Sequence, residues 1–354
     1  FSRRSRWRAG HSYFTTRLHQ KCGRAPFRLT KTHLIRDALP TDPEAPFGDL
    51  IAGDTKHIVA WVKENNPNRH APDRANKTVQ PPGDRDCKLG VKSRSNRTVP
   101  LPATPTTAPI PASQAVAQTE AYWGYASGIV VTRTAAGTVV LAERTRPFNE
   151  GDMTYFTPLM AQTETCLGSR PRIGVWDAAF DSQETYTYFD AAGGFAAVPL
   201  NARGQEARTF DAAGNPCCAA GLGMPRQFAY QHRGDGAPHE RGKHRCPLLF
   251  PQVTGDPCPI DDPHFASGGC TTTIATSIGA RIRWQLDREG AAYRQAYRQR
   301  TMVEQINSQA LALGIEQPKL RSLEGIAHQT TLIYVQINLR VYHRLRSRPA
   351  GLPT

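Results

Sequence analysis

Apolar residues along the chain are grouped into short runs of strand length, separated by clusters of turn-forming residues. The first run, residues 49–61, is rich in Ile, Val and Ala and is interrupted by Asp54, a pattern typical of a buried strand with one polar position. Two β-branched runs within residues 122–145 flank the sequence TAAGT and predict a hairpin. Residues 154–168 predict a helix that ends at Gly168.

The next run of the chain, residues 171–200, predicts a strand–helix–strand unit. An apolar strand ends in Asp177, a helix covers residues 182–192, and a second apolar strand follows Gly193 and Gly194. Units of this kind form parallel strand pairs, so we expect an α/β fold with a mixed sheet flanked by helices.

Three segments lack a sustained period. Residues 1–46 are interpreted as an N-terminal arm or remnant, and residues 62–120 combine a basic excursion with a proline-rich linker. Residues 201–280 hold many turn residues and five of the cysteines. We expect the last two segments to be insertions into a core made of residues 47–200 and 281–354.

Two helices are expected at the C-terminal end. Residues 285–313 predict one long charged helix, and residues 322–346 predict a second helix with a basic end. The basic run of residues 340–348 is a candidate for nonspecific contact with DNA phosphates or, equally, a solvated helix end.

The charge of the chain narrows the choice of partner. The 354 residues include 44 Lys and Arg against 30 Asp and Glu, a formal net charge of +14, which favours a polyanionic partner such as nucleic acid. No run of about 18 apolar residues exists, and the first residues lack the apolar core of a signal peptide. We therefore expect no membrane association and a location in a bacterial-type cytosol or nucleoid.

The cysteines offer a candidate metal site. Cys246, Cys258 and Cys270 are evenly spaced, and Cys217 or Cys218 would complete four thiolates, a set that suits structural Zn²⁺. The spacing lacks a Cys-x-x-Cys motif, so plain thiols in a reducing compartment are the alternative. His239 and His244 are alternative ligands or parts of a basic DNA-facing loop.

Three acidic residues carry the main functional hypothesis. Asp54 and Asp177 lie on apolar strands and Glu304 lies on the predicted long helix. A carboxylate on a buried strand is costly unless it is paired or bound to a cation, and two divalent cations would remove the repulsion among three of them. Such a metal pair suits in-line displacement at phosphorus.

The predicted long helix adds a second group of residues. Tyr293, Tyr297, Arg300 and Glu304 are spaced by 4, 3 and 4 residues, which places them on one stripe of a regular α-helix. Arg300 could then bind a phosphate with two hydrogen bonds, and Tyr297 could donate a hydrogen bond or stack. This face is a candidate contact for a DNA backbone.

Three separate segments resemble bacterial insertion-sequence DDE transposases, in the same order along the chain. The signature helix of that family has Tyr, two residues, Arg, three residues, Glu, six residues and Lys, and Tyr297, Arg300 and Glu304 match it, whereas the Lys position is Leu311. The segments GDTKH, residues 53–57, and WDAAFDS, residues 176–182, resemble the strands of the first and second catalytic aspartates.

The resemblance covers residues 47–346 and implies a ribonuclease H-like fold with an inserted cysteine-containing subdomain before the last catalytic helix. It implies Asp54, Asp177 and Glu304 as ligands of two Mg²⁺ or Mn²⁺ ions, cleavage at transposon ends, strand transfer into target DNA, and action as a homodimer on double-stranded DNA. Asp181 is an alternative second ligand, although its place before SQET is typical of a helix N-cap.

Two neighbours of the first aspartate and two rival functions stay open. Lys56 and His57 are candidate DNA contacts, or else a surface lysine and a partly buried structural histidine. Because Leu311 replaces the family lysine, a decayed or repurposed DNA-binding relic is one rival. The other is a nuclease of the same fold that cleaves DNA without joining it.

Overall fold

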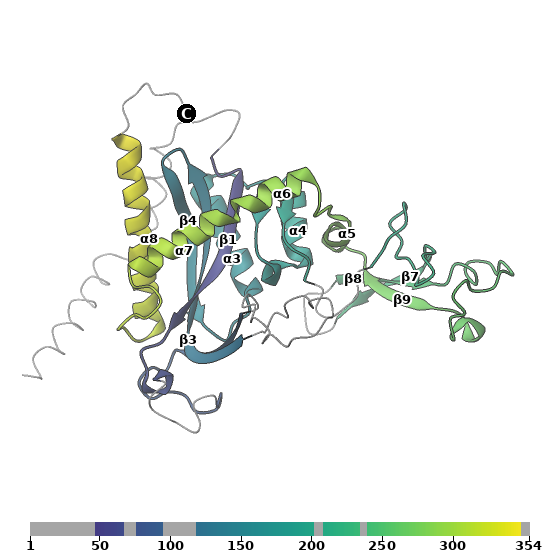
Figure 1. Ribbon diagram of the computed structural model, residues 1–354, viewed down its shortest axis with the longest axis horizontal. Coiled ribbons are helices and arrows are strands. Elements are labelled where there is room, and N and C mark those ends of the chain that lie inside the picture. The colour runs from purple at the N-terminus through teal and green to yellow at the C-terminus, as the bar shows by residue number, and fades with distance from the viewer. Residues whose placement is uncertain (1–46, 67–75, 95–117, 202–207, 234–238, 348–354) are drawn as a thin grey trace, which may run out of the picture. The chain divides into compact units, whose positions relative to one another are not determined.

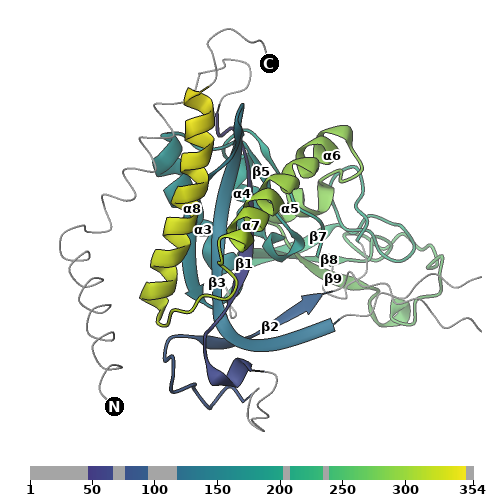
Figure 2. The same ribbon diagram turned by 60° about the vertical axis from the view of Figure 1, so that its left-hand side comes forward.

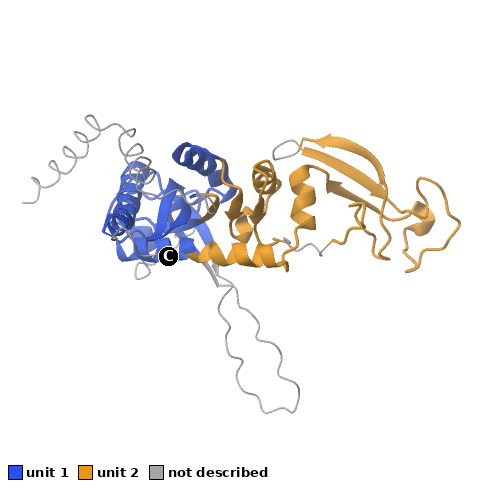
Figure 3. Cartoon of the chain, turned by 90° about the horizontal axis from the view of Figure 1, so that it is seen from above, with its two compact units in different colours: residues 1–47, 54–169, 302–354 blue, residues 48–53, 170–301 orange. Residues whose placement is uncertain are grey.

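The computed structural model shows a mixed α/β protein whose described residues fall into two compact units (Figure 3). Unit 1 comprises residues 1–47, 54–169 and 302–354, and unit 2 comprises residues 48–53 and 170–301. The residues that the structure describes are 47–66, 76–94, 118–201, 208–233 and 239–347. The predicted arm of residues 1–46 and the proline-rich part of the first insertion lie outside this set.

The main sheet has strand order β2-β3-β1-β5-β6, with β4 paired to β3, and each pairing falls within one unit. Unit 1 holds its antiparallel part, in which β3 pairs with both β2 and β4. The strands of this part are β2 (Lys88–Arg94), β3 (Gln118–Thr134) and β4 (Gly137–Pro147), and β1 (Leu50–Val59), which follows β3 in the sheet order, is shared between the units. The first strand and the hairpin predicted from the sequence are confirmed, whereas β2 was not foreseen.

Two helices cover opposite faces of the β3–β4 hairpin in unit 1 (Figures 1 and 2). They are α3 (Met153–Leu167) and α8 (Leu323–Arg346). A Cβ at Gly128 would meet Tyr155 of α3, whereas the neighbouring Ser127 contacts Tyr334 of α8. Successive residues of a strand point to opposite faces, so the two helices enclose the hairpin. Both predicted helices are confirmed, and Gly168 ends α3 in the left-handed conformation, φ 74°.

A buried asparagine joins α8 to β4. The Asn338 amide accepts a hydrogen bond from the Val140 backbone N–H and donates one to the Val140 carbonyl, both at 2.8 Å. The β3–β4 ladder shifts register between Val130 and Val131, and Val140, the partner of Val131, lies at this irregularity. Asn338 therefore satisfies two buried backbone groups of β4.

Unit 2 contains the predicted strand–helix–strand unit. The first residues of β1 pair in parallel with β5 (Ile173–Val175), and β5 pairs in parallel with β6 (Phe195–Ala197). Helix α4 (Gln183–Asp190) connects these strands after the short 3₁₀ turn η2 (Ala178–Phe180) and packs against α5 (Ile278–Gln285). The parallel arrangement expected from the sequence is confirmed.

Unit 2 also contains a second sheet that the sequence pattern did not reveal. Residues 201–280 were expected to have little regular structure, but they form an antiparallel sheet of β7 (Arg226–His232), β8 (His239–Arg245) and β9 (Thr271–Ala275), together with the turn η3 (Phe265–Ser267). The alternation that marks a strand is carried here mainly by basic, polar and glycine residues, so no apolar period of two was visible.

The prediction of one uninterrupted helix over residues 285–313 is wrong. Helix α6 begins after Gly290 and covers Ala291–Tyr297, the 3₁₀ turn η4 covers Arg298–Arg300, and α7 covers Thr301–Ala312. A 3₁₀ turn has about 3.0 residues per turn, so the regular stripe of an α-helix does not continue unchanged through it. Among the described helices, none has both the length and the apolar character needed to cross a bilayer.

Candidate functional site

Asp54 lies within β1, at the first residue of that strand that belongs to unit 1. Its side chain is half-buried, and its Oδ1 accepts a hydrogen bond from the Thr55 N–H at 2.8 Å. The Thr55 hydroxyl donates to Asp152 Oδ1 at 2.6 Å, just before α3. Burial raises the pKa of Tyr334, and the negative charge of Asp54 adds to that rise. The first predicted aspartate is therefore held on a strand, and its charge acts on a buried tyrosine of α8.

The residue before Asp54 shows how the sequence shapes this strand. Gly53 has no Cβ, and the indole ring of Trp176 occupies the space that a Cβ would take. Both residues belong to unit 2, and Trp176 is fully buried. Gly53 and Trp176, the residues that precede Asp54 and Asp177, thus pack directly against each other, because the Trp176 ring leaves no room for a Cβ at position 53.

Asp177 lies at the carboxyl end of β5 and is half-buried. Its Oδ1 accepts a hydrogen bond from the Ala179 N–H at 2.9 Å, so the residue caps the η2 turn. Within the part of the chain that the structure describes, no donor reaches its other carboxylate oxygen. Asp177 therefore combines a fixed backbone with an oxygen that can accept a ligand, as the sequence hypothesis requires.

Asp181, the alternative second ligand, has a different environment. Its carboxylate is fully buried and accepts hydrogen bonds from the Tyr186 hydroxyl at 2.7 Å and the Asn201 N–H at 2.8 Å. Arg283 of α5 donates to Asp181 Oδ2 from Nε at 2.9 Å and from Nη2 at 2.6 Å. The expectation that Asp181 is a helix N-cap is wrong, because Ser182 caps α4. Asp181 instead ties α4 to α5.

A second arginine extends this network within unit 2. Arg288 donates to the Tyr186 hydroxyl at 2.9 Å and to the Val198 carbonyl at 3.0 Å. Burial, followed by the charge of Asp181, raises the pKa of Tyr186, so its hydroxyl remains a donor at neutral pH. Neither Arg283 nor Arg288 was a candidate from the sequence, since no short motif links them to Asp181.

Three of the four residues predicted to share a helix face are brought together in unit 2. The rings of Tyr293 and Tyr297 are stacked, with centroids 5.6 Å apart and an interplanar angle of 9°. Arg300 donates from Nη1 to the Tyr297 hydroxyl at 3.3 Å. Tyr293 is buried, whereas Tyr297 and Arg300 are half-buried and thus partly available to a ligand.

Glu304 lies in the first turn of α7 in unit 1 and is exposed. The buried face of this helix consists of Met302, Val303, Ile306 and Ala310. Leu311 is 48% exposed, so the residue at the family's lysine position does not belong to that buried face. Because Glu304 is in unit 1 and Asp177 is in unit 2, the approach of all three carboxylates to one another stays a prediction.

The two neighbours of Asp54 have structural partners. Lys56 forms an ion pair with Glu316, with 3.2 Å between Nζ and Oε1, and its side chain is largely buried. The ring of His57 packs against Phe148, with centroids 4.4 Å apart. Both contacts explain these residues without DNA, and their predicted role as DNA contacts stays a prediction.

The cysteines predicted to bind zinc are only partly brought together. The Cys246 N–H donates to the Cys270 carbonyl at 2.9 Å, and burial and the neighbouring charges of Cys246 and Cys218 raise the pKa of Cys270 to about 12. Cys218 is thus one of the neighbours whose charge acts on this thiol. Cys258 lies in the loop before η3, where its carbonyl accepts from Asp261 N–H at 3.2 Å.

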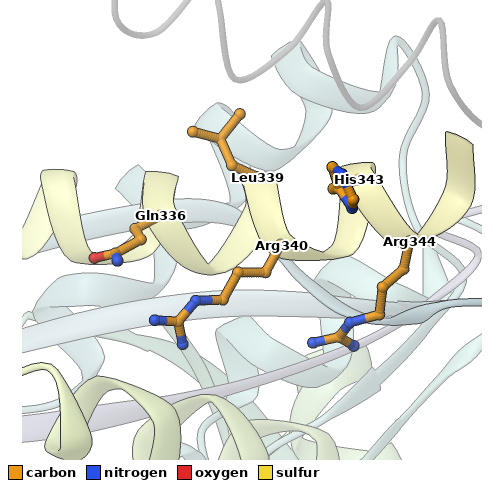
Figure 4. Close-up of a pocket in the computed structure, with 5 residues that line it drawn as sticks. All are labelled: Gln336, Leu339, Arg340, His343 and Arg344. Carbon is orange, nitrogen blue, oxygen red and sulfur yellow. The ribbon is translucent and has the colours of Figure 1, made fainter. Parts of the chain in front are cut away.

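The basic end of α8 forms an open hollow of about 460 Å³. Figure 4 shows Arg340 and Arg344 extending to the same side of the helix. The other residues lining the hollow are Gln336, Leu339 and His343. Arg344 also donates to the Ala136 carbonyl at 3.1 Å, so this arginine is partly engaged with the β3–β4 turn.

Among the described residues, no set of three or more His, Cys, Asp or Glu side chains is arranged to hold a metal ion. The predicted Mg²⁺ and Zn²⁺ sites therefore stay predictions. Comparisons of the chain with protein-family models, curated proteins and solved structures give no match.

Proposed function

We propose that the protein is a metal-dependent DNA transposase with a ribonuclease H-like catalytic core, in which Asp54, Asp177 and Glu304 are the catalytic carboxylates. The observation that supports this proposal most is the contrast between two aspartates four residues apart. Asp181 is enclosed by Tyr186, Asn201 and Arg283, whereas Asp177 keeps a carboxylate oxygen open at a strand end.

The parallel register of unit 2 gives further support. Ala52 of β1 pairs with Val175 of β5, and Asp54 and Asp177 each follow that pair by two residues. Asp177 follows the carboxyl end of β5, the kind of position where α/β proteins bind ligands, whereas Asp54 lies within β1 just beyond the residues paired with β5. The inference that Glu304 is the third acid comes from the family signature on α6, η4 and α7.

The donor chemistry fits a hard divalent cation, because the three proposed ligands are all carboxylates. Mg²⁺ or Mn²⁺, when bound by Asp54, Asp177 and Glu304, supplies charge neutralisation for displacement at phosphorus. The chain's own contribution is positioning. Arg300, whose guanidinium donates to Tyr297 and is half-buried, is proposed to bind a DNA phosphate, and the stacked Tyr293 restricts the movement of Tyr297.

The reaction proposed is cleavage at transposon ends followed by joining of the freed 3′-hydroxyl to target double-stranded DNA. The transposases that this chain resembles act on two ends as a paired complex, so we infer a homodimer on DNA. A nuclease of the same fold would give cleavage without joined products, and a DNA-binding relic would give neither.

A single assay separates these three functions. The full chain is incubated with Mn²⁺, a linear duplex carrying the sequences that flank its coding region, and a supercoiled target plasmid. We expect cleaved ends and joined products from the unaltered protein, and neither from Glu304→Gln. The matched control is Glu324→Gln, which alters an exposed glutamate in the first turn of α8 and should retain activity. Activity in Glu304→Gln equal to that of the unaltered protein would refute the assignment.

A further inference from the structure

The second sheet of unit 2 is formed by β7, β8 and β9 (Figure 1), and on one of its faces aromatic residues of β7 are paired with basic residues of β8. Phe228 and Tyr230 of β7 are 48% and 41% exposed, and their ring centroids lie 6.1 Å apart. Residues separated by two on a strand point to the same face, so both rings lie on one side of the sheet. A pair of large exposed aromatics on a folded sheet is a common feature of binding surfaces.

The neighbouring strand adds positive charge beside each ring. Lys243 of β8 pairs with Phe228, and its Nζ lies 5.9 Å from the centre of that ring. Arg241 pairs with Tyr230 in the same register. The next pair on this face, His232 and His239, has ring centroids 5.3 Å apart. We call these six residues the aromatic–basic face.

On β8 and β9 the other side of the sheet is the buried one, whereas β7 is buried on neither side. Gly242 and His244 of β8 and Ile274 of β9 are buried there. His244 Nδ1 makes a hydrogen bond of 2.9 Å with the Met224 carbonyl. Glu240, the acidic residue of β8, accepts a hydrogen bond from Thr276 and lies out of phase with Arg241 and Lys243. The aromatic–basic face therefore combines stacking surfaces with cations and contains no carboxylate among its six residues.

We propose that the aromatic–basic face binds single-stranded DNA, with unpaired bases stacked on Phe228 and Tyr230 and the phosphates near Arg241 and Lys243. Every base has a flat π-face, and sheet-borne aromatics interleaved with cations recognise bases that are not stacked in a duplex. Bases inside a duplex are stacked on their neighbours and cannot lie on these rings. The choice of DNA as the nucleic acid rests on the proposed function.

The test measures binding of the full chain to a fluorescent 20-nucleotide oligo(dT) and to a 20-base-pair duplex. In Phe228→Thr/Tyr230→Thr, which keeps strand-forming residues, oligo(dT) affinity should fall by about tenfold or more while duplex affinity changes by less than about twofold. In Arg241→Gln/Lys243→Gln, the slope of log affinity against log salt for oligo(dT) should fall by about 1.4. Gln231→Thr, an exposed position on the other face of β7, is the matched control and should bind as the unaltered protein does.

Several results would overturn the proposal: no oligo(dT) binding by the unaltered protein, an unchanged affinity in the aromatic variant, an equal loss in Gln231→Thr, or an equal loss for the duplex. Thermal melts of both double variants check that the fold is intact, and the basic variant tests the face with its rings retained. Oligo(dT) binding that depends on these residues, together with absent DNA cleavage, would refute the proposed function and leave this inference standing. The reverse result would refute only this inference.

Discussion

Replacing Asp177 and Asp181 separately by asparagine tests the division of roles between them. The two residues flank the same 3₁₀ turn, so the variants differ little in sequence position but strongly in environment. Asp177→Asn keeps an oxygen that can accept the Ala179 N–H bond. Asp181→Asn removes the charge that faces Arg283 and places an amide donor among donors from Tyr186 and Asn201.

The expected magnitudes follow from these contacts. The Asp181 side chain is 0% exposed and that of Arg283 is 16% exposed, so the ion pair is buried. Removing one partner of a buried pair costs about 3–5 kcal/mol, which lowers the melting temperature by about 6–20 °C at about 2–4 °C per kcal/mol. Asp177→Asn loses no buried partner, and its free energy of unfolding should change by less than about 0.5 kcal/mol.

Thermal melts and Mn²⁺-dependent DNA cleavage, measured on both variants, provide the readout. Asp177→Asn should melt like the unaltered protein and fail to cleave DNA. Asp181→Asn should melt early but cleave DNA at temperatures where it is folded. A stable, inactive Asp181→Asn together with an active Asp177→Asn would show that Asp181, and not Asp177, is the metal ligand.

Three further substitutions test the structure at other points. In Asn338→Leu the Val140 N–H and carbonyl lose their hydrogen-bond partner, so urea unfolding should show that the free energy of unfolding falls by about 2 kcal/mol or more. Gln336→Leu, at an exposed position of the same helix, should change it little, and equal losses in the two variants would contradict the role of Asn338. Burial, and then the charge of Tyr297, raises the pKa of Tyr293 to about 12 from its ordinary value of 10, so between about pH 10 and 12 the folded state keeps a proton that the unfolded state loses, and the free energy of unfolding falls as pH rises. Tyr293→Phe should therefore lose less stability with rising pH in alkaline melts, and a loss identical to that of the unaltered protein would argue against a buried phenol. Leu311→Lys places a cation at an exposed position, so the slope of log duplex affinity against log salt should become steeper by about 0.9, while the free energy of unfolding changes by less than about 0.5 kcal/mol. An unchanged slope would show that position 311 does not contact DNA.

Apolar patterning predicted the elements that carry a clear apolar signal. Strand β1 and the β3–β4 hairpin carry continuous apolar runs that are buried, and α3 and α8 each carry one apolar face, so the sequence was sufficient for them. The sheet of β7, β8 and β9 was missed because its exposed face holds basic and aromatic residues and its buried face includes Gly242 and His244.

For the candidate site, the sequence named the residues of a hypothesis but could not describe their surroundings. The sequence could rank Asp177 above Asp181, but it could not show that Arg283, about a hundred residues later, encloses Asp181. Nor could it show that the ring of Trp176 occupies the space of a Cβ at Gly53, or that the charge of Cys218 raises the pKa of Cys270. The 3₁₀ turn before Glu304 contains no Gly or Pro, so no local signal marked it.

Asp54, Asp177 and Glu304 are proposed to form one divalent-cation site. Mn²⁺ binding to the full chain, followed by electron paramagnetic resonance in the presence of a duplex, tests it without depending on turnover. We expect Asp54→Asn, Asp177→Asn and Glu304→Gln each to weaken Mn²⁺ binding by about tenfold or more, while Glu324→Gln binds normally. Unchanged Mn²⁺ affinity in all three variants would contradict it.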